Sequence, residues 1–361
     1  MTELRRVLIM AGGTGGHVVP ALSLAKALQD RGVTVEWLGS PRGIENRLVP
    51  AAGIALHQLD IAGLRGNGLS GWLAVPWRLT RAVLQARRVI RRFEPQLVVG
   101  LGGFASGPGG LAARLCGRPL MVHEQNAIAG LTNRSLSRLA TRTYAAFPGA
   151  FPDDKALVVG NPVRAEIAAL GERVRTAQEM TGRRLHLLVM GGSLGAQSLN
   201  EKLPLALATL DADARPLVRH QAGRDKDEKT SAAYRDAGVD AEVSAFIDDM
   251  AEAYDWADLI VCRAGALTIA ELSAAGKPSL LVPFPHAVDD HQTLNARHLV
   301  DAGGAELVQQ SALTPARLED TLKSLLRPER LASMAVDARR VAHLDAVDRL
   351  VDGCMEIGLE R

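Results

Sequence analysis

Short hydrophobic runs alternate with longer amphipathic segments along most of the chain. The runs Arg6–Met10 and Val33–Leu38 flank the segment Pro20–Arg31, in which apolar residues recur at helical spacing. Short apolar runs bounded by glycines are typical of buried parallel strands, and the helical period is typical of a helix that covers them. The alternation begins again at Leu185–Met190. The pattern therefore predicts an α/β protein built from strand–helix–strand units.

This restart divides the chain into two predicted domains. The chain has 361 residues, of which 47% are hydrophobic but only 4% aromatic, and 35 are glycines, so each domain is large enough for its own core. We expect residues 1–162 and 163–361 to form two Rossmann-like, doubly wound domains that face each other across a cleft. The last helix is able to cross back to the first domain.

Each predicted domain opens on a glycine-rich turn after its first strand. Gly12–His17 reads GGTGGH, and Gly191–Ala196 reads GGSLGA at the same place in the second domain. Such a turn brings bare backbone close to a ligand, and the helix after it points free N–H groups and a positive dipole end at an anion. A dinucleotide site is the alternative. However, the glycines do not follow G-x-G-x-x-G, and Gly39-Ser40 stands where a ribose-binding acid belongs.

The stretch Arg263–Asn295 carries the most detailed pattern. The predicted strand Leu259–Cys262 leads through a tight turn at Gly265 into a helix from about Ala266. A helix that begins at a glycine turn after a parallel strand offers a seat for a diphosphate.

Polar side chains accompany this diphosphate seat. Glu271 lies on the same helix, where a carboxylate can accept both hydroxyls of a ribose. Gln292 and Asn295 lie one turn apart on the next predicted helix, where their amides can bind sugar hydroxyls. These groups describe a nucleotide-sugar site. Alternatively, Thr268 and Glu271 form only a capping box, and the amides are surface residues.

The segment between Ile61 and Phe93 contains seven arginines and no acidic residue. Helical spacing from Pro76 predicts a basic stripe and an apolar stripe, with Trp72 at the start of the segment. The basic stripe holds Arg78, Arg81, Gln85, Arg88 and Arg92, and the apolar stripe holds Leu73, Trp77 and Leu84. This combination suits an anionic membrane surface, at ~1 kcal/mol for each basic residue near the headgroups. The alternative is an ordinary helix that covers the sheet and exposes its arginines to solvent.

The predicted strand Leu120–His123 ends in the polar sequence HEQN, residues 123–126. Polar residues at the carboxyl end of a parallel strand usually line the ligand cleft. His17, the glycine loops and this cluster all follow strand ends, so we expect them to share one crevice.

Together these motifs resemble the MurG family of bacterial N-acetylglucosaminyltransferases, which make lipid II from lipid I. The motifs are GGTGGH at 12–17, HEQN at 123–126, GNPVR at 160–164, GGSLGA at 191–196, the segment Arg263–Glu271 and HQTLN at 291–295. They occur in both halves, so the resemblance covers essentially the whole chain. It departs at His291, where the family commonly has the first of two consecutive glutamines. Gln292 fits the second glutamine, and the role of His291 stays open.

The resemblance implies a fold of the glycosyltransferase B type, with the acceptor and the membrane on the N-terminal domain and UDP-N-acetylglucosamine (UDP-GlcNAc) mostly on the C-terminal domain. Arg164 and Ser193 would meet the diphosphate, and the backbone at Ile247 would read the uracil. The implied substrate-binding residues are Thr14, Gly15, Gly16, Asn126, Arg164, Ser193, Ile247, Ala266, Leu267, Thr268, Ile269, Ala270, Glu271, Gln292 and Asn295.

Inverting transfer of the sugar needs a base for the acceptor hydroxyl and stabilisation of the departing diphosphate. The helix start and Arg164 can provide that stabilisation, so no metal or other cofactor is expected. His17 and Glu124 are the candidate bases. His17 can instead make a helix-start hydrogen bond or contact the acceptor phosphates, and Glu124 can be a structural cap. The Asp-x-Asp at Asp211–Asp213 reads as a turn in solvent.

Charge and cysteine usage narrow the partners and the location. The net charge of +2 gives no global field for nucleic acid. The cysteines form no C-x-x-C pair, as expected of reduced thiols in a cytosolic protein. No run is apolar enough to span a membrane. We therefore expect a peripheral protein on the cytoplasmic face of the bacterial inner membrane, in contact with other cell-wall synthesis proteins.

Other classes of protein remain open at this stage. Another UDP-sugar enzyme of the same fold, an epimerase or a glycolipid transferase, is the main alternative. The basic segment with its tryptophans argues against an epimerase, because a soluble sugar nucleotide needs no membrane surface. A non-catalytic membrane scaffold would not need Arg164, Ser193 and Glu271 together.

Overall fold

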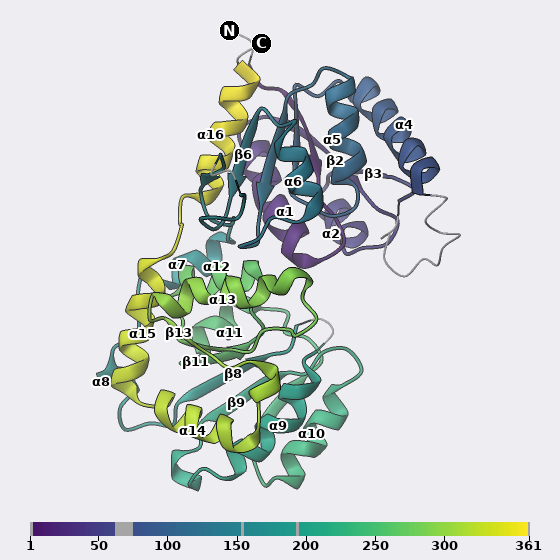
Figure 1. The fold of residues 1–361 in the computed structure, drawn as a ribbon. Coiled ribbons are helices and arrows are strands. Elements are labelled where there is room, and N and C mark those ends of the chain that lie inside the picture. Colours follow the sequence, from purple (N-terminus) through teal and green to yellow (C-terminus); the bar gives the residue numbers. More distant parts are fainter. Residues whose placement is uncertain (1–2, 62–74, 153–154, 193–194, 360–361) are drawn as a thin grey trace. The chain divides into compact units, whose positions relative to one another are not determined.

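The computed structural model describes residues 3–61, 75–152, 155–192 and 195–359. The chain divides into two compact units, residues 1–162 together with 344–361, and residues 163–343. Figure 1 shows that each unit is a parallel sheet with helices on its faces, and the prediction of an α/β fold with two doubly wound domains is confirmed.

The first unit is built on a seven-stranded parallel sheet with the order β3-β2-β1-β4-β5-β6-β7. Its strands are β1 (Arg6–Met10), β2 (Thr34–Gly39), β3 (Ala55–Gln58), β4 (Leu97–Gly100), β5 (Leu120–Glu124), β6 (Arg142–Ala145) and β7 (Leu157–Val158). Its helices are α1 (Gly15–Gln29), α2 (Glu45–Ala51), α4 (Val75–Phe93), α5 (Ser106–Leu115), α6 (Leu131–Ser137) and α16 (Ala346–Leu359).

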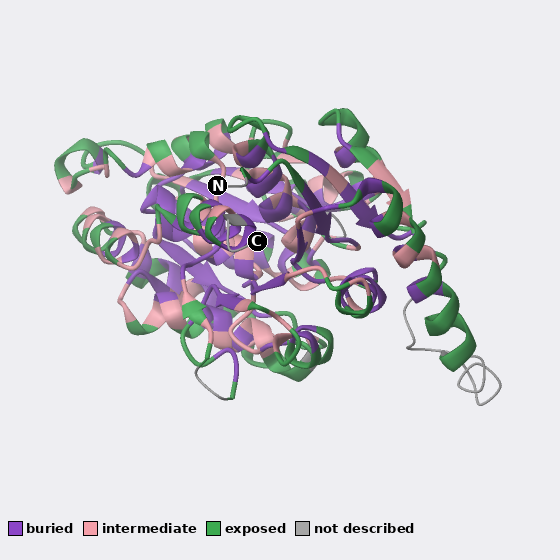
Figure 2. Ribbon diagram, turned by 90° about the horizontal axis from the view of Figure 1, so that it is seen from above, coloured by how far each residue is buried: buried purple, intermediate pink, exposed green. Residues whose placement is uncertain are grey.

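Alternate residues of these strands enter two different cores, one on each face of the sheet. Val7 and Ile9 of β1 pack with α1 and with α16, whereas Leu8 and Met10 pack with α4 and α5. Figure 2 shows the strands buried between the helices, while the outer face of α4 is exposed. The last helix of the chain is thus part of the first unit, where its buried Cys354 lies in the core.

The second unit is built on a six-stranded parallel sheet with the order β10-β9-β8-β11-β12-β13. Its strands are β8 (His186–Met190), β9 (Leu217–Gln221), β10 (Ala241–Ser244), β11 (Leu259–Cys262), β12 (Ser279–Leu281) and β13 (Ala305–Leu307). Its helices are α7 (Ala165–Leu170), α8 (Ala177–Met180), α9 (Gln197–Ala208), α10 (Asp227–Asp236), α11 (Met250–Trp256), α12 (Ala266–Ala275), α13 (His291–Asp301), α14 (Pro315–Leu325) and α15 (Pro328–Arg340).

Both sheets reverse their strand order once, between β1 and β4 in the first unit and between β8 and β11 in the second. In open α/β sheets the ligand binds outside the carboxyl ends of the strands at this reversal. The loops that follow these four strands are therefore the positions at which chemistry is expected.

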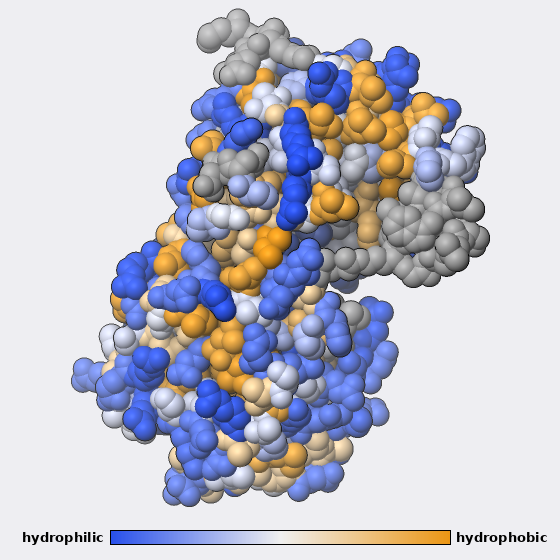
Figure 3. Space-filling view, viewed as in Figure 1, coloured by the Kyte–Doolittle hydropathy of each residue, from blue (hydrophilic) through white to orange (hydrophobic). Residues whose placement is uncertain are grey.

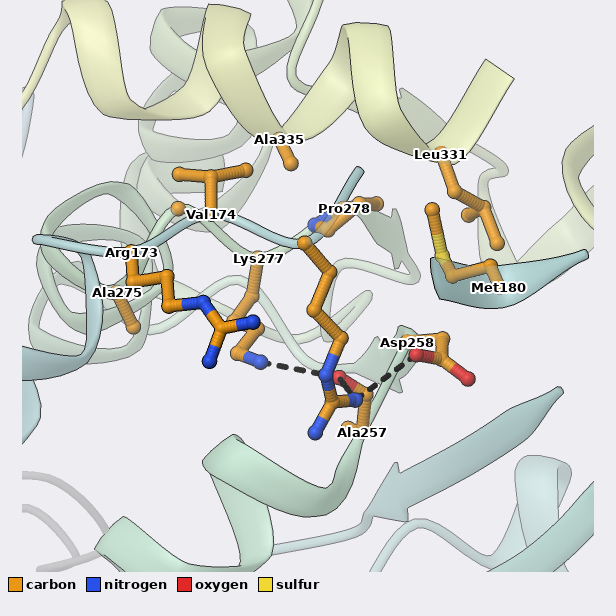
Figure 4. Close-up of a pocket in the computed structure, with 12 residues that line it drawn as sticks. Arg173, Val174, Met180, Ala257, Asp258, Ala275, Lys277, Pro278, Leu331 and Ala335 are labelled. Atoms are coloured by element: carbon orange, nitrogen blue, oxygen red, sulfur yellow. Dashed lines mark hydrogen bonds and ion pairs between the residues drawn. The ribbon is translucent and has the colours of Figure 1, made fainter. Parts of the chain in front are cut away.

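Residues 170–184, which have the weakest hydrophobic pattern, are anchored to the second sheet. Arg175 and Arg183 each donate to the Asp258 carboxylate at 2.8 Å, as does the backbone N–H of His186. Burial alone would raise the pKa of Asp258, but these hydrogen bonds outweigh it and lower the pKa below its usual value. Asp258 and Arg175 line a small pocket, in which Figure 4 shows Asp258 and Lys277. This pocket lies near the C-terminal end of α12. The reversal of strand order lies at the other end of that helix.

Candidate active site

The second unit places the start of α12 at its strand-order reversal. β11 ends at Cys262, and the helix begins after Gly265, an extended N-cap residue with φ −63° and ψ 145°. The first turn of α12 carries no acidic side chain, so its N–H groups and dipole favour a bound anion. Thr268 is the third residue of this helix rather than its N-cap. The alternative of a capping box between Thr268 and Glu271 is therefore wrong.

Glu271 and Arg164, both predicted to contact the donor, form an ion pair within this unit. Arg164 Nη2 donates to Glu271 Oε1 at 3.0 Å, and the Tyr254 hydroxyl donates to Oε2 at 3.2 Å. Glu271 is only 6% exposed. Burial raises the pKa of its carboxyl, and the charge of Arg164 opposes that rise. Arg164 Nε is buried and makes no hydrogen bond within the described residues. The guanidinium thus retains one donor that no described residue uses.

The GNPVR segment that precedes this pair is fastened at both ends. His123 Nε2 lies 2.9 Å from the carbonyl oxygen of Gly160, and Asn161 Nδ2 donates to Gln125 O at 3.0 Å, all within the first unit. Two residues after the end of that unit, Arg164 reaches Glu271 in the second. The segment is therefore anchored to the first unit before Pro162 and to the second unit through Arg164.

Three side chains fasten the loops that follow β11 and β12. Asn295 is fully buried and donates to Ala264 O at 3.2 Å, so its amide supports the turn before α12; its contact with the sugar stays a prediction. Gln292 Oε1 accepts the N–H of Phe284 at 2.9 Å. Arg263 donates to the carbonyl oxygens of Val282 and Pro283 at 3.1 and 3.2 Å and lies over the Phe284 ring. Sequence reasoning gave Arg263 no role, because its partners lie on the next strand.

The other predicted donor residues are distributed along the same edge of the sheet. Leu267, Thr268 and Ala270 are half-buried in α12, whereas the side chains of Ala266 and Ile269 are buried, so those two can offer only backbone. Ile247 is half-buried in the loop between β10 and α11. Ser193 lies outside the described residues.

The first unit brings its two glycine loops into contact. A Cβ atom on Gly103, in the loop after β4, would lie 2.5 Å from the carbonyl oxygen of Gly12, in the loop after β1. Gly103 also has a φ of +84°, which L-residues rarely adopt. The GGTGGH loop leads into α1, which begins at Gly15, and Thr14 is its extended N-cap residue. Gly15 and Gly16 are thus the first two residues of a helix that starts at the strand-order reversal.

His17 is the third residue of α1, and its ring is held by both loops. Its Nδ1 lies 3.3 Å from Gly12 O. A carbonyl oxygen can only accept a hydrogen bond, so Nδ1 carries the proton and the basic lone pair of the neutral ring is on Nε2. A Cβ atom on Gly102 would lie 2.9 Å from Cδ2 of the ring, so the second loop packs directly against it.

The prediction that the whole HEQN cluster lines the cleft is wrong for three of its side chains. His123, Glu124 and Gln125 are buried, and only Asn126 is half-buried. Burial lowers the pKa of His123 to about 4 against the weaker effect of its hydrogen bond to Gly160 O.

Glu124 binds its own loop with both carboxylate oxygens. Oε1 accepts the backbone N–H of Asn126 at 2.9 Å and its Nδ2 at 3.2 Å. Oε2 accepts the N–H of Gly130 at 3.2 Å and Nδ2 of Asn133 at 2.9 Å. These donors occupy the lone pairs of the carboxylate, so the structure favours the alternative in which Glu124 is a structural cap.

α4 exposes the residues that were predicted to form its two stripes. Trp77 is 72% exposed and Leu84 47% exposed, and the exposed basic residues are Arg78, Arg81, Arg88 and Arg92. Arg81 pairs with Asp60 at 2.9 Å. Apolar side chains gather over α5 and the adjacent part of α4 (Figure 3). Trp72 and Leu73 lie outside the described residues.

The described residues hold neither a membrane-spanning helix nor a cluster of metal-binding side chains. None of the helices there is both long and apolar enough to pass through a membrane. In the same part of the chain, no group of three His, Cys, Asp or Glu side chains is placed to hold a metal ion. Asp211–Asp213 lies at an exposed turn.

Two doubly wound domains, each with a helix start at its strand-order reversal, define a fold of the glycosyltransferase B type. Residues 7–145 match the N-terminal domain of glycosyltransferase family 28, and residues 186–350 match its C-terminal domain. The chain belongs to glycosyltransferase family 28, and the predicted family resemblance is confirmed.

The similar proteins are matched over nearly their full length. One, from Chromohalobacter salexigens, is 72% identical over 98% of this chain and 97% of its own. Another, from Azotobacter vinelandii, is 55% identical over 97% of this chain and 98% of its own length. Both are named UDP-N-acetylglucosamine–N-acetylmuramyl-(pentapeptide) pyrophosphoryl-undecaprenol N-acetylglucosamine transferase.

Solved structures give the same result. The crystal structure of Acinetobacter baumannii MurG matches with a TM-score of 0.84 and 43% identity, and covers 98% of this chain and 99% of its own. The crystal structure of a UDP-GlcNAc 2-epimerase from Neisseria meningitidis matches with a TM-score of 0.67 and covers 99% of this chain and 100% of its own. Its sequence identity is only 16%, so the match shows a shared fold alone.

Proposed function

We propose that this protein transfers N-acetylglucosamine from UDP-GlcNAc to lipid I, the muramoyl-pentapeptide diphosphate polyprenol, and so forms lipid II for peptidoglycan synthesis. The observation that carries the proposal is the ion pair between Arg164 and Glu271, which lies on α12, the helix that begins at the strand-order reversal. A nucleotide sugar needs a cation for its diphosphate and an acceptor for its ribose hydroxyls, and this site holds both. The names of the full-length relatives support the same substrates.

The donor would displace the ion pair of the ligand-free site. Glu271 would accept the ribose hydroxyls in place of Arg164, and Arg164 would turn to the diphosphate, which the N–H groups of α12 also bind. When the bond between the sugar and the diphosphate breaks, negative charge grows on the diphosphate. Donors that are already aimed at this position stabilise the transition state.

The acceptor hydroxyl would attack the anomeric carbon in one displacement. A carbon–oxygen bond forms on one face of the sugar, the bond to the diphosphate breaks on the other, UDP leaves, and the configuration inverts. His17 Nε2 is the proton acceptor that we propose, because the Nδ1–H tautomer leaves its lone pair there. Glu124 is not proposed as the base, because its oxygens already bind four donors of their own loop.

The proposed acceptor is a lipid, so the first unit would work at a membrane. Exposed arginines and Trp77 on α4 adjoin α5, whose Leu111 and Leu115 are 38% and 59% exposed. Cationic side chains bind anionic headgroups, while exposed apolar side chains enter the interface. We place the protein peripherally on the cytoplasmic face of the bacterial inner membrane on this basis.

Incubation of the protein with radiolabelled UDP-GlcNAc, with and without a polyprenyl-diphosphate-muramoyl acceptor, tests the proposal. We expect label in the lipid product only when the acceptor is present, with release of one UDP for each sugar transferred and no loss of rate in EDTA. An epimerase would instead convert UDP-GlcNAc without acceptor, and that outcome would replace the proposal.

A further inference from the structure

The GGTGGH loop is supported from behind by a buried carboxylate that belongs to none of the predicted motifs. Glu45, the first residue of α2, has no exposed surface. Its Oε2 accepts the N–H of Gly13 at 2.9 Å, and its Oε1 accepts the N–H and the hydroxyl of Ser40 at 3.1 and 2.8 Å. A buried carboxylate is costly unless it is well hydrogen-bonded, and these charge-assisted bonds offset that cost.

Three glycines surround this carboxylate so closely that no other residue would fit without movement. A Cβ atom on Gly12 would lie 2.6 Å from Oε1, and one on Gly39 would lie 2.9 Å from Cγ. A Cβ atom on Gly43 would lie 2.0 Å from Oε2. The backbone on all three sides therefore approaches Glu45 as closely as bare glycine permits, and the carboxylate and the loop hold each other in one position.

The peptide that Glu45 binds is also the peptide that holds His17. The N–H of Gly13 and the carbonyl of Gly12 belong to one peptide group, and in a trans peptide they point in opposite directions. Glu45 Oε2 accepts from the N–H, and His17 Nδ1 donates to the carbonyl oxygen on the other side. The result is a continuous hydrogen-bonded chain from a carboxylate through one peptide to an imidazole.

We infer that Glu45 is a positioning residue for His17, which acts through the Gly12–Gly13 peptide. The inference rests on the proposed function, in which His17 takes the proton of the acceptor hydroxyl. A carboxylate on the N–H polarises the peptide and makes its carbonyl a stronger acceptor. This holds the Nδ1–H tautomer, keeps Nε2 basic, and stabilises the imidazolium that forms when Nε2 takes the proton. A carboxylate bonded directly to a catalytic histidine works in the same way.

We call the hydrogen-bonded chain from Glu45 through the Gly12–Gly13 peptide to His17 the relay. The tautomer of His17 tests this relay without a measurement of activity. ¹⁵N NMR of protein labelled at histidine, with His17 assigned by its loss in His17→Gln, should show the proton of the neutral ring on Nδ1. In Glu45→Gln, which keeps the shape but removes the charge, the proton should be shared between Nδ1 and Nε2. Glu36→Gln is the matched control, because Glu36 binds His57 on the neighbouring strand and does not contact the loop. A wild-type ring with its proton on Nε2 would overturn the inference, and this measurement needs no variant of Glu45 to fold.

Kinetics test whether the relay serves the reaction. At saturating donor and acceptor, Glu45→Gln should lower kcat about tenfold with the donor KM unchanged, while Glu36→Gln keeps both. In a His17→Ala background, Glu45→Gln should cost nothing further, because its effect passes through the missing ring.

Two other outcomes would count against the inference and can be told apart. An equal tenfold loss with and without His17 would mean that Glu45 acts on the loop as a whole, and the inference would be overturned. Full kcat in His17→Ala would instead overturn the role of His17 in the proposed function, and with it the kinetic effect of Glu45. The tautomer measurement is read independently, so a failed relay and a failed proposed function give different results.

Discussion

The two units place a glycine turn and a helix start at the same point of the same kind of sheet, but they support these turns in different ways. In the first unit a carboxylate, Glu45, binds the backbone N–H of the turn from the inside. In the second unit the turn is held through a carbonyl by the Asn295 amide, and the nearby carboxylate, Glu271, pairs with an arginine.

This difference suggests a division of tasks. Support on the N–H of Gly13 fixes the orientation of a peptide, and through it the orientation of His17. Support on the carbonyl of Ala264 involves none of the N–H groups at the start of α12. Changes in the first unit should therefore act on the proton transfer and the acceptor, and changes in the second on donor binding.

The largest effect that we expect from this division of tasks is that of His17→Ala in the first unit. We expect kcat to fall by about 10²–10⁴-fold with little change in the donor KM, since a general base contributes that much to a proton transfer. Steady-state kinetics at saturating acceptor measure it. If the acceptor KM rises instead while kcat is kept, His17 contacts the acceptor phosphates equally in ground and transition states.

The exposed arginines of the first unit provide a second test. Replacement of Arg78, Arg88 and Arg92 by glutamine should weaken binding to anionic vesicles by about 100-fold, at roughly 1 kcal/mol for each residue. Activity on a short soluble acceptor should be kept. Arg81→Gln is the matched control: it should have a smaller effect, because Arg81 already pairs with Asp60. Sedimentation with vesicles at low and high salt measures the binding of the triple variant and of the control. Binding that changes neither with salt nor with the three substitutions would contradict the proposed membrane surface.

In the second unit, Glu271→Ala should raise the donor KM by about 10- to 100-fold, the equivalent of the ~1.5–3 kcal/mol carried by hydrogen bonds to a charged group. The acceptor KM should stay unchanged. Tyr254→Phe removes one donor to the same carboxylate and keeps the ion pair, so it should raise the donor KM less. A donor KM that is unchanged in Glu271→Ala would show that the carboxylate only anchors Arg164.

The elements of both units follow from hydrophobic periodicity, which is a local property, and the sequence therefore predicted the strands and helices that carry Gly12–His17 and Glu271. The residues that it missed depend on long-range packing. Glu45 is separated by 32 positions from Gly13, whose N–H it binds, and nothing around it resembles a motif. A possible signal was the spacing of Gly12, Gly39 and Gly43 at strand ends and turns, but that became specific only when the fold placed all three around one carboxylate.

The HEQN cluster shows the converse problem. Its position at the end of β5 was predicted correctly, yet strand-end position does not say which way a side chain turns. Glu124 has backbone and amide donors within its own loop, and their number decides that it faces inward. Such donors become visible only when residues 126–133 have folded back over the carboxylate.

Each unit contains a buried histidine, and these two residues allow the same test in both units. The test is the dependence of the free energy of unfolding on pH, where we expect the smallest effect. His123 in the first unit and His220 in the second are buried, and burial lowers their pKa values to about 4 and about 3, from an ordinary value of 6.5. Between these limits the unfolded chain binds more protons than the folded one. The free energy of unfolding is therefore highest above pH 6.5 and falls as the pH drops from 6.5 toward 4, by about 1–2 kcal/mol for each histidine by pH 5.

Urea titrations at pH 7 and pH 5 should show this loss in the wild type. His123→Gln and His220→Gln should each reduce the dependence on pH, whatever they do to the stability at pH 7, and His286→Gln, at an exposed position, should leave it unchanged. His220 packs against Tyr234 and Asn200 only within its own unit, whereas His123 also binds Gly160 in the segment that leads to Arg164. Both rings are nevertheless largely neutral in the folded protein at pH 5, because both pKa values lie below 5. We therefore expect donor affinity to change equally between pH 7 and pH 5 in the wild type, His123→Gln and His220→Gln, and a fall in the wild type that His123→Gln removes would contradict this expectation.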